Sequence, residues 1–271
     1  MSRAEQQHRA RKRFGQNFLH DESIINHIVR SIRPAATDNM VEIGPGKGAI
    51  TRLILDTCEQ LNVVELDRDL IPILQEKFGH IPTFNINQAD ALKFDFAQLG
   101  NAEKPLRIVG NLPYNISTPL IFHLLSYSHM VRDMHFMLQK EVVMRMAAKA
   151  GENNYGRLSI MTQYSCDVEY LFDVGPECFD PQPKVDSAIV RLTPQAKPRH
   201  PVEDHKTLDI VVRTAFSQRR KTLRNTLKTL LTSDELEALN IDPSLRPETL
   251  PLETYVTLAN YLFNKPDEQH S

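Results

Sequence analysis

The chain has 271 residues, of which 41% are hydrophobic and 24% charged, and its formal net charge is −2. These values are typical of a globular protein and exclude a collagen-like chain, a coiled-coil rod and a largely disordered chain. No apolar run approaches the ~18 residues of a membrane span, and the basic N-terminus is not followed by an apolar stretch, so we expect a cytoplasmic protein without a secretory signal.

Helical and strand-like patterns alternate along most of the chain. Residues 21–32 carry an amphipathic helical stripe that Asp21 opens as a cap. Strands separated by helices, each too apolar to be half-exposed, favour a parallel sheet covered on both faces, and we predict a mainly parallel α/β sheet of seven strands. The expected strands are 39–43, 61–66, 83–87, 106–111, 134–139, 167–174 and 187–192, and the expected helices between them are 48–57, 69–78, 118–127, 140–149 and 155–165.

The composition and periodicity of the sequence change after the last expected strand. Residues 193–204 are polar and rich in proline, which is typical of a linker, and only helical periodicity follows. We therefore predict two domains, a ligand-binding α/β domain at 1–195 and a small all-helical domain at 196–271.

A glycine-rich turn follows the first strand of the sheet. Gly44, Gly46 and Gly48 allow the backbone to approach a ligand closely, although a tight strand-to-helix connection would have the same composition. The dinucleotide-binding pattern requires glycine where this chain has Ala49, and Glu42 lies within the strand. This combination suits a ligand that has a positive amino-acid group and no pyrophosphate.

Two further acids stand at the ends of the next strands. Glu65 can accept hydrogen bonds from both hydroxyls of a ribose, and Asp90 can accept from an exocyclic adenine amine. Each could instead be a surface carboxylate or a helix cap, but carboxylates at successive strand ends point to a nucleoside site. The arrangement resembles the class I, Rossmann-like, S-adenosyl-L-methionine-dependent methyltransferases.

The loop after the fourth strand reads Gly110-Asn111-Leu112-Pro113-Tyr114. The side-chain oxygen of Asn111 and the carbonyl of Leu112 could accept both hydrogens of an adenine amine and direct its nitrogen at a methyl group. Pro113 stiffens the turn and Tyr114 offers a ring for stacking. An ordinary loop with a packed tyrosine is the alternative.

Four motifs together identify a resemblance to a family. The Asn-Leu-Pro-Tyr loop resembles the signature of amino-group methyltransferases, and the segment at 12–19 (KRFGQNFL) is similar to the N-terminal cofactor motif of rRNA adenine N6-dimethyltransferases. Phe179-x-Pro181-x-Pro183-x-Val185-x-Ser187 resembles the late motif of that family, and 218–225 (QRRKTLRN) resembles the basic helix of its bacterial small-subunit branch.

The resemblance implies S-adenosyl-L-methionine as the cofactor and N6 of two adjacent adenosines in the 3′-terminal hairpin of 16S rRNA as the target. The partner would be that RNA within the small (30S) ribosomal subunit or a late assembly intermediate, with the protein acting as a monomer away from membranes. By this resemblance, Asn17, Leu19 and Gly44 would contact the methionine portion of the cofactor. Glu65 would hold its ribose and Asp90 its adenine amine. Asn111 would lie between cofactor and substrate, and Tyr114 and Phe179 would stack on the target base.

Basic residues are concentrated in two segments. Residues 1–20 hold five basic residues against one acid, and 210–233 hold six with no acid, whereas 234–271 hold eight acids and two bases. Phosphate contacts depend on local charge, so these segments favour RNA docking, although solvated helix faces would give the same pattern. We expect a helical stripe of Arg219, Arg220, Lys221 and Arg224 to contact the ribosomal subunit without base specificity.

Other functions remain open at this stage. The chain could modify 23S rRNA and confer antibiotic resistance, modify adenine in DNA, or act mainly as a non-catalytic RNA-binding assembly factor. A non-catalytic scaffold would be expected to lose Asn111 or Glu65, and both are present. Three separated cysteines and ten histidines show no ligand spacing, so we expect no metal site.

Overall fold

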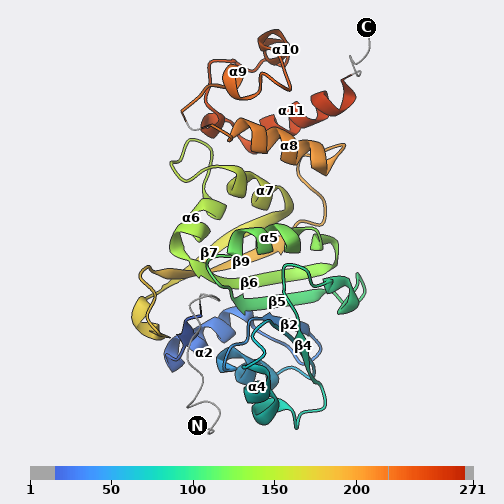
Figure 1. The fold of residues 1–271 in the computed structure, drawn as a ribbon. Helices are drawn as coiled ribbons and strands as arrows, with labels where there is room; N and C mark the ends of the chain where they lie inside the picture. The colour runs from blue at the N-terminus through green and yellow to red at the C-terminus, as the bar shows by residue number, and fades with distance from the viewer. Residues whose placement is uncertain (1–15, 219, 266–271) are drawn as a thin grey trace. The chain divides into compact units, whose positions relative to one another are not determined.

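Seven strands form the central sheet of the protein, in the order β4-β3-β2-β5-β6-β9-β7 (Figure 1). The computed structural model describes residues 16–218 and 220–265. Neighbouring strands from β4 to β6 are parallel, whereas β9 is antiparallel to β6 and β7, which confirms the mainly parallel seven-stranded sheet. The strands are β2 (Asn39–Ile43), β3 (Leu61–Glu65), β4 (Phe84–Gln88), β5 (Leu106–Asn111), β6 (Val131–Gln139), β7 (Cys166–Val174) and β9 (Ser187–Pro194).

The strand order reverses beside β2. Strands β3 and β4 continue the sheet on one side of β2, and the chain then returns to place β5 on the other side. In open parallel sheets, ligands bind at the carboxyl ends of the strands at such a reversal. The ends of β2, β3 and β5 therefore define where the functional site is expected.

Helices cover both faces of the sheet (Figure 1). One face is covered by α2 (Glu22–Ile32), α3 (Ala49–Leu55) and α4 (Ile71–Phe78), whose apolar residues join the strands in one hydrophobic cluster. The opposite face is covered by α5 (Ser117–Leu125). The Asp21 carboxylate caps α2 by accepting a hydrogen bond from the Ile24 N–H at 2.9 Å, as expected. Short 3-10 helices are η2 (Phe96–Gln98), η3 (Ser128–Met130), η4 (Pro176–Cys178) and η5 (Pro247–Thr249).

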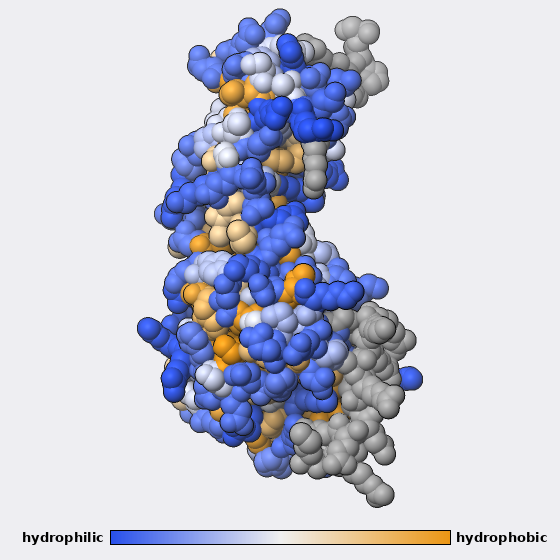
Figure 2. Space-filling model, turned by 90° about the vertical axis from the view of Figure 1, so that its left-hand side faces the viewer, coloured by the Kyte–Doolittle hydropathy of each residue, from blue (hydrophilic) through white to orange (hydrophobic). Residues whose placement is uncertain are grey.

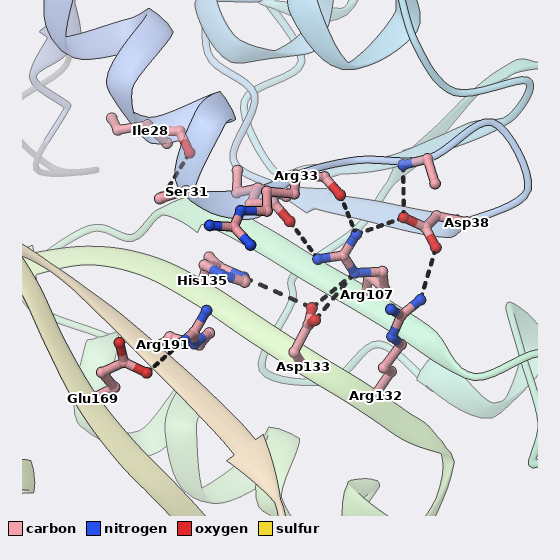
Figure 3. A network of polar contacts seen from close by, with 12 residues as sticks. Ile28, Ser31, Arg33, Asp38, Arg107, Arg132, Asp133, His135, Glu169 and Arg191 are labelled. Atoms are coloured by element: carbon pink, nitrogen blue, oxygen red, sulfur yellow. Dashed lines mark hydrogen bonds and ion pairs between the residues drawn. The ribbon is translucent and has the colours of Figure 1, made fainter.

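A buried ion-pair network connects α2 to β5 and β6 (Figure 3). The Arg107 guanidinium donates to Asp38 at 2.5 Å and to Asp133 at 3.0 Å, and it also donates to the carbonyls of Ile32 and Arg33, where α2 ends. His135 lies beside this network, and burial lowers its pKa to about 4, so its ring is neutral at pH 7. The network fixes α2 against the sheet.

A second, two-stranded sheet brings together distant parts of the chain. Strand β1 (Phe18–Leu19) pairs antiparallel with β8 (Phe179–Asp180), with Leu19 opposite Phe179. The N-terminal cofactor motif and the late motif of the sequence therefore lie next to each other.

The described residues form two compact units, and their division differs in part from the expected domains. The first unit contains the residues up to Val143 together with Cys166–Pro194, and the second contains Met144–Ser165 and the residues from Gln195 onward. The chain passes from the first unit to the second between residues 194 and 195, next to the expected domain boundary at 195/196. Residues 144–165, however, were expected in the first domain. This segment belongs to the second unit because Ile160 and Tyr164 pack in its hydrophobic cluster.

The second unit is helical. Its helices are α7 (Arg157–Ser165), α8 (His205–Ala215), α9 (Leu223–Thr226), α10 (Ser233–Ala238) and α11 (Leu252–Asn264), and α6 (Lys140–Ala147) leads from the first unit into it. Thr232 and Glu235 form a reciprocal capping box at the start of α10. The expected small all-helical region is thus present, with α7 added to it.

The basic segment does not form the continuous helix that we expected. Arg220 has a left-handed backbone with φ of 65°, and α9 begins only after Thr222 and has four residues. The N–H groups of Leu223 and Arg224 donate to the carbonyls of Leu245 and Pro243, so contacts from another loop replace the hydrogen bonds of a longer helix. The predicted helical stripe is therefore wrong as a secondary structure, and Arg219 lies outside the described residues.

The surface in Figure 2 is largely hydrophilic, with hydrophobic side chains in small separate patches. In the described part of the chain, no helix is long and apolar enough to cross a membrane. The same residues contain no cluster of three or more histidine, cysteine or acidic side chains that could hold a metal ion.

Candidate active site

A cavity of about 340 Å³ lies at the carboxyl ends of β2, β3, β4 and β5. Its lining is mainly apolar, with carboxylates outnumbering cations. The acids that line it are Glu42, Glu65, Asp67 and Asp90, and Lys47 is the cation that the described lining contains. This balance suits a ligand with a positive charge and does not suit a pyrophosphate.

The glycine turn forms one wall of the cavity and needs glycine for its backbone. Gly44, Gly46 and Gly48 all have positive φ, at 66°, 59° and 83°. The N–H of Gly44 donates to the Val64 carbonyl at 2.9 Å, which ties the turn to the end of β3. A Cβ on Gly48 would lie 2.5 Å from the ring of Phe78, so this position is also closed to larger residues.

Glu65 ends β3 and is 6% exposed. One oxygen accepts a hydrogen bond from the Asp67 N–H at 2.8 Å, and the other accepts from the Gly46 N–H at 3.4 Å. Burial raises the pKa of this carboxyl to about 7, although the two N–H donors oppose the rise. A ligand with paired hydroxyls can supply the further donors that stabilise the ionised carboxylate.

Glu42 is a second buried carboxyl at this wall. It lies on β2, and one of its oxygens accepts a hydrogen bond from the Thr51 hydroxyl at 2.6 Å. Burial raises its pKa to about 7 as well, and the neighbouring charge of Glu65 adds to the rise. The site therefore holds two buried carboxyls whose pKa values burial raises to about 7.

Asp90 and Leu66 line the part of the cavity beside β3 and β4. One oxygen of Asp90 accepts a hydrogen bond from the Leu92 N–H at 3.0 Å, which fixes the carboxylate after β4. Leu66 is 49% exposed although it is large and apolar. Sequence reasoning missed Leu66, and the available signal was an apolar residue directly after a strand-end carboxylate.

Residues 16–19 line the cavity and are hydrogen-bonded to two of the strand ends that surround it. Gln16 donates to Asp67 at 2.8 Å at the end of β3, and the Asn17 carbonyl accepts from the Asn111 amide at 3.1 Å at the end of β5. Phe18, Asn17 and Leu19 all line the cavity. Asn17 and Leu19 were expected here, whereas Gln16 and Asp67 were missed because their contact is long-range.

The reaction loop presents oxygen acceptors to the cavity. The hydrogen bond to Asn17 uses the amide nitrogen of Asn111, which leaves the side-chain oxygen of Asn111 as an acceptor. The N–H of Leu112 donates to the Met137 carbonyl at 3.1 Å and holds the start of the loop on β6. Tyr114 also lines the cavity, and its hydroxyl lies 2.7 Å from that of Ser187.

Phe179 is not among the residues that line the cavity. Its side chain is 1% exposed and belongs to the hydrophobic cluster under β1 and β8, outside the lining of the cavity. The structure thus brings Tyr114 to the cavity without Phe179. The proposed stacking of the target base on Phe179 stays a prediction.

The predicted RNA-contacting residues belong to the second unit. Arg220, Lys221 and Arg224 are exposed, and none of them lines the cavity. Their exposure agrees with a docking role.

The fold and the cavity together define a class of protein. A mainly parallel sheet with this strand order, a glycine turn, a carboxylate at the end of β3 and an acid-rich cavity with little positive charge are the features of S-adenosylmethionine-dependent methyltransferases. The residues of the cavity fit that cofactor, because Glu65 and Asp90 can accept hydrogen bonds from its nucleoside and the other acids suit its positively charged groups.

Comparison with known proteins identifies the family within this class. The family model described as ribosomal RNA adenine dimethylase matches residues 7–264, and the chain belongs to this family. A relative named ribosomal RNA small subunit methyltransferase A, from Pseudomonas savastanoi pv. phaseolicola, is 63% identical over 96% of this chain and 97% of its own length. One of the same name from Saccharophagus degradans is 64% identical over 95% and 96%.

Two solved structures are also similar. A dimethyladenosine transferase from Plasmodium falciparum has a TM-score of 0.75 at 26% identity and covers 89% of this chain and 95% of that one. The 23S rRNA methyltransferase ErmE has a TM-score of 0.70 at 25% identity and covers 92% and 100%.

Proposed function

We propose that this protein transfers methyl groups from S-adenosyl-L-methionine to N6 of two adjacent adenosines in the 3′-terminal hairpin of 16S rRNA, giving N6,N6-dimethyladenosine. The observation that carries the proposal is the oriented amide of Asn111, whose nitrogen is held by the Asn17 carbonyl while its oxygen is left for the substrate. A carbonyl or amide oxygen is what an adenine amine needs as a partner.

Some residues of the site would bind the cofactor and others the target base. Asn17, Leu19 and Gly44 would hold the methionine portion, Glu65 the ribose and Asp90 the adenine of the cofactor, which when bound supplies an activated methyl group. Asn111 and the Leu112 carbonyl accept the two hydrogens of the substrate amine and aim its lone pair. Alignment of this kind is worth about 7–11 kcal/mol of the barrier, so a strong base is not required.

The target base must leave its stack to reach the loop. Extrusion costs a few kcal/mol, and stacking on Tyr114 returns about 1–3 kcal/mol, with Phe179 as the proposed second ring. After transfer the cationic amine loses a proton to solvent. The monomethylated nitrogen retains one hydrogen, which one acceptor can still hold, so a second transfer follows in the same site once a fresh molecule of cofactor has replaced the spent one.

The small-subunit substrate is favoured over 23S rRNA by the degree of similarity. The small-subunit enzymes are 63–64% identical to this chain, whereas the 23S enzyme is 25% identical. We further propose that the partner is 16S rRNA within the 30S subunit or a late assembly intermediate, and that the protein binds it as a monomer in the cytoplasm. Residues 1–195 without 144–165 would then act as the catalytic domain, and the region from 196 together with 144–165 as the RNA-docking domain.

A labelling experiment tests the proposal. Radiolabelled S-adenosylmethionine is supplied with undermethylated small subunits, large subunits and plain DNA in parallel, and the nucleosides are analysed. We expect label in N6,N6-dimethyladenosine from small subunits alone. Label from large subunits or DNA, or a product that stays monomethylated, would contradict the proposal.

The docking role of the basic segment has its own test. The double charge reversal Lys221→Glu with Arg224→Glu should weaken binding to the small subunit and flatten its salt dependence, because fewer counterions are released. Cofactor affinity should not change. An unchanged salt slope would remove these residues from the interface.

A further inference from the structure

Ser187 is a buried serine whose hydroxyl reaches the reaction loop. It begins β9, its side chain is 0% exposed, and its Oγ lies 2.7 Å from the Tyr114 Oη, where either hydroxyl can donate. This hydrogen bond joins the last residue of the late motif to the last residue of the Asn-Leu-Pro-Tyr loop. The proposed mechanism gives Ser187 no role.

Ser187 is held rigidly by the sheet. It pairs with Gln139 of β6 on one side and with Val174 of β7 on the other. The carbonyl of the preceding residue, Asp186, accepts a hydrogen bond from the Lys140 N–H at 2.9 Å. The Ser187 hydroxyl is therefore a fixed point from which a loop residue can be aligned.

Tyr114 is held at its two ends. Its backbone carbonyl accepts a hydrogen bond from the Ser117 hydroxyl at 3.1 Å, and its own hydroxyl is bonded to Ser187. The ring between these two points is half-buried and lines the cavity. Burial raises the pKa of the Tyr114 hydroxyl, which keeps it protonated and able to share a hydrogen with Ser187.

We propose that Ser187 is a positioning residue that fixes the ring of Tyr114 in the orientation needed to stack the extruded adenine. The inference rests on the proposed function for its catalytic consequence, but the fixed ring itself does not depend on that function. Ser187 touches neither the base nor the cofactor in this role and acts only through Tyr114.

The test uses the full-length protein and four variants, Ser187→Ala, Ser187→Thr, Tyr114→Phe and the double variant Ser187→Ala with Tyr114→Phe. Ser187→Ala and Tyr114→Phe should each lower kcat about two- to tenfold, the equivalent of one hydrogen bond, with little change in the KM for S-adenosylmethionine. The double variant should be no slower than the slower single variant, because both substitutions remove the same bond. Ser187→Thr, which keeps a hydroxyl, should recover part of kcat.

A second readout reports the ring directly. The protein is labelled with 3-fluorotyrosine, and the 19F resonance of Tyr114 is identified by its loss in Tyr114→Phe. We expect one narrow resonance in the wild-type protein and a shifted or broadened one in Ser187→Ala. Ser159→Ala is the matched control, because Ser159 is equally buried but bonds to the Arg145 carbonyl in the second unit. It should lower the melting temperature without changing the Tyr114 resonance or kcat.

Several outcomes would overturn the inference. Additive losses in the double variant, an unchanged Tyr114 resonance in Ser187→Ala, or full kcat in Tyr114→Phe would each do so. If Ser187→Ala does not fold, Tyr114→Phe still tests the inference, because it removes the same hydrogen bond from the tyrosine side. A wild-type protein that methylates no RNA would refute the proposed function, while the fluorine resonance would still test the fixed ring.

Discussion

Replacing Glu65 by glutamine should make the cofactor-free protein more stable and bind its cofactor less tightly. Glu65 is buried, and its pKa is raised from the ordinary 4.5 to about 7. The unfolded chain loses this proton near pH 4.5 and the folded protein only near pH 7, so the charge lowers stability increasingly between these values and by a constant amount above them. At about 1.4 kcal/mol per pH unit, the cost at pH 8 is at most about 3.5 kcal/mol.

Glutamine removes that cost but introduces a smaller one. Its oxygen can still accept from the Asp67 N–H, whereas its amide nitrogen would face the N–H of Gly46, which is a loss of about 1 kcal/mol. We therefore expect a net gain of about 1–2 kcal/mol at pH 8, which corresponds to a rise in melting temperature of about 2–8 °C. At pH 5 the gain should largely disappear.

Thermal unfolding of the cofactor-free protein at pH 8 and pH 5 measures the stability, and calorimetric titration measures cofactor affinity. Affinity should fall about tenfold or more, because hydrogen bonds to a charged acceptor are lost. Glu76→Gln is the matched control, because its side chain on α4 is exposed and already solvated. A melting temperature at pH 8 no higher than that of the wild type, or a gain independent of pH, would refute the reasoning.

Three other predictions concern single positions. Asn111→Ala should lower kcat about a hundredfold or more in methyl-transfer assays while the protein still binds S-adenosylmethionine, and near-normal kcat would remove Asn111 from the reaction. Arg107→Met should lower the free energy of unfolding by about 3–5 kcal/mol in urea titrations, because it leaves the Asp133 carboxylate without its cation and Asp38 with only the exposed Arg132. By contrast, Arg132→Ala, at a side chain 60% exposed, should lower it by less than about 1 kcal/mol. Gly48→Ala should lower the free energy of unfolding by about 2–4 kcal/mol, because a φ of 83° is strained for alanine and the new Cβ would meet the ring of Phe78. A smaller loss would show that α4 shifts easily to make room.

The strands and the acids of the site could be predicted from local sequence. Strands 39–43 and 106–111 have the predicted bounds, because runs of buried apolar residues between turn residues are a short-range signal. The carboxyl ends of parallel strands meet at one edge, so the sequence alone predicts that Glu65, Asp90 and Asn111 lie close together. All three line the same cavity.

The remaining features depend on contacts between distant segments. The basic segment at 218–225 has helical residues, but the carbonyls of Pro243 and Leu245 draw its N–H groups away from a longer helix. Phe179 is expected at the target base because its motif resembles that of the family, but the motif does not indicate that Phe179 is buried and lies opposite Leu19. The sequence of 155–165 predicts a helix, yet it cannot indicate which hydrophobic core the helix joins.

The chain passes between the two units three times, after Val143, Ser165 and Pro194. A truncation at the proline-rich linker would therefore not yield an independent catalytic fragment. It would remove α8 and α11 but retain α7, and would leave Ile160 and Tyr164 without the helices that cover them. Such a fragment should expose these apolar side chains and aggregate.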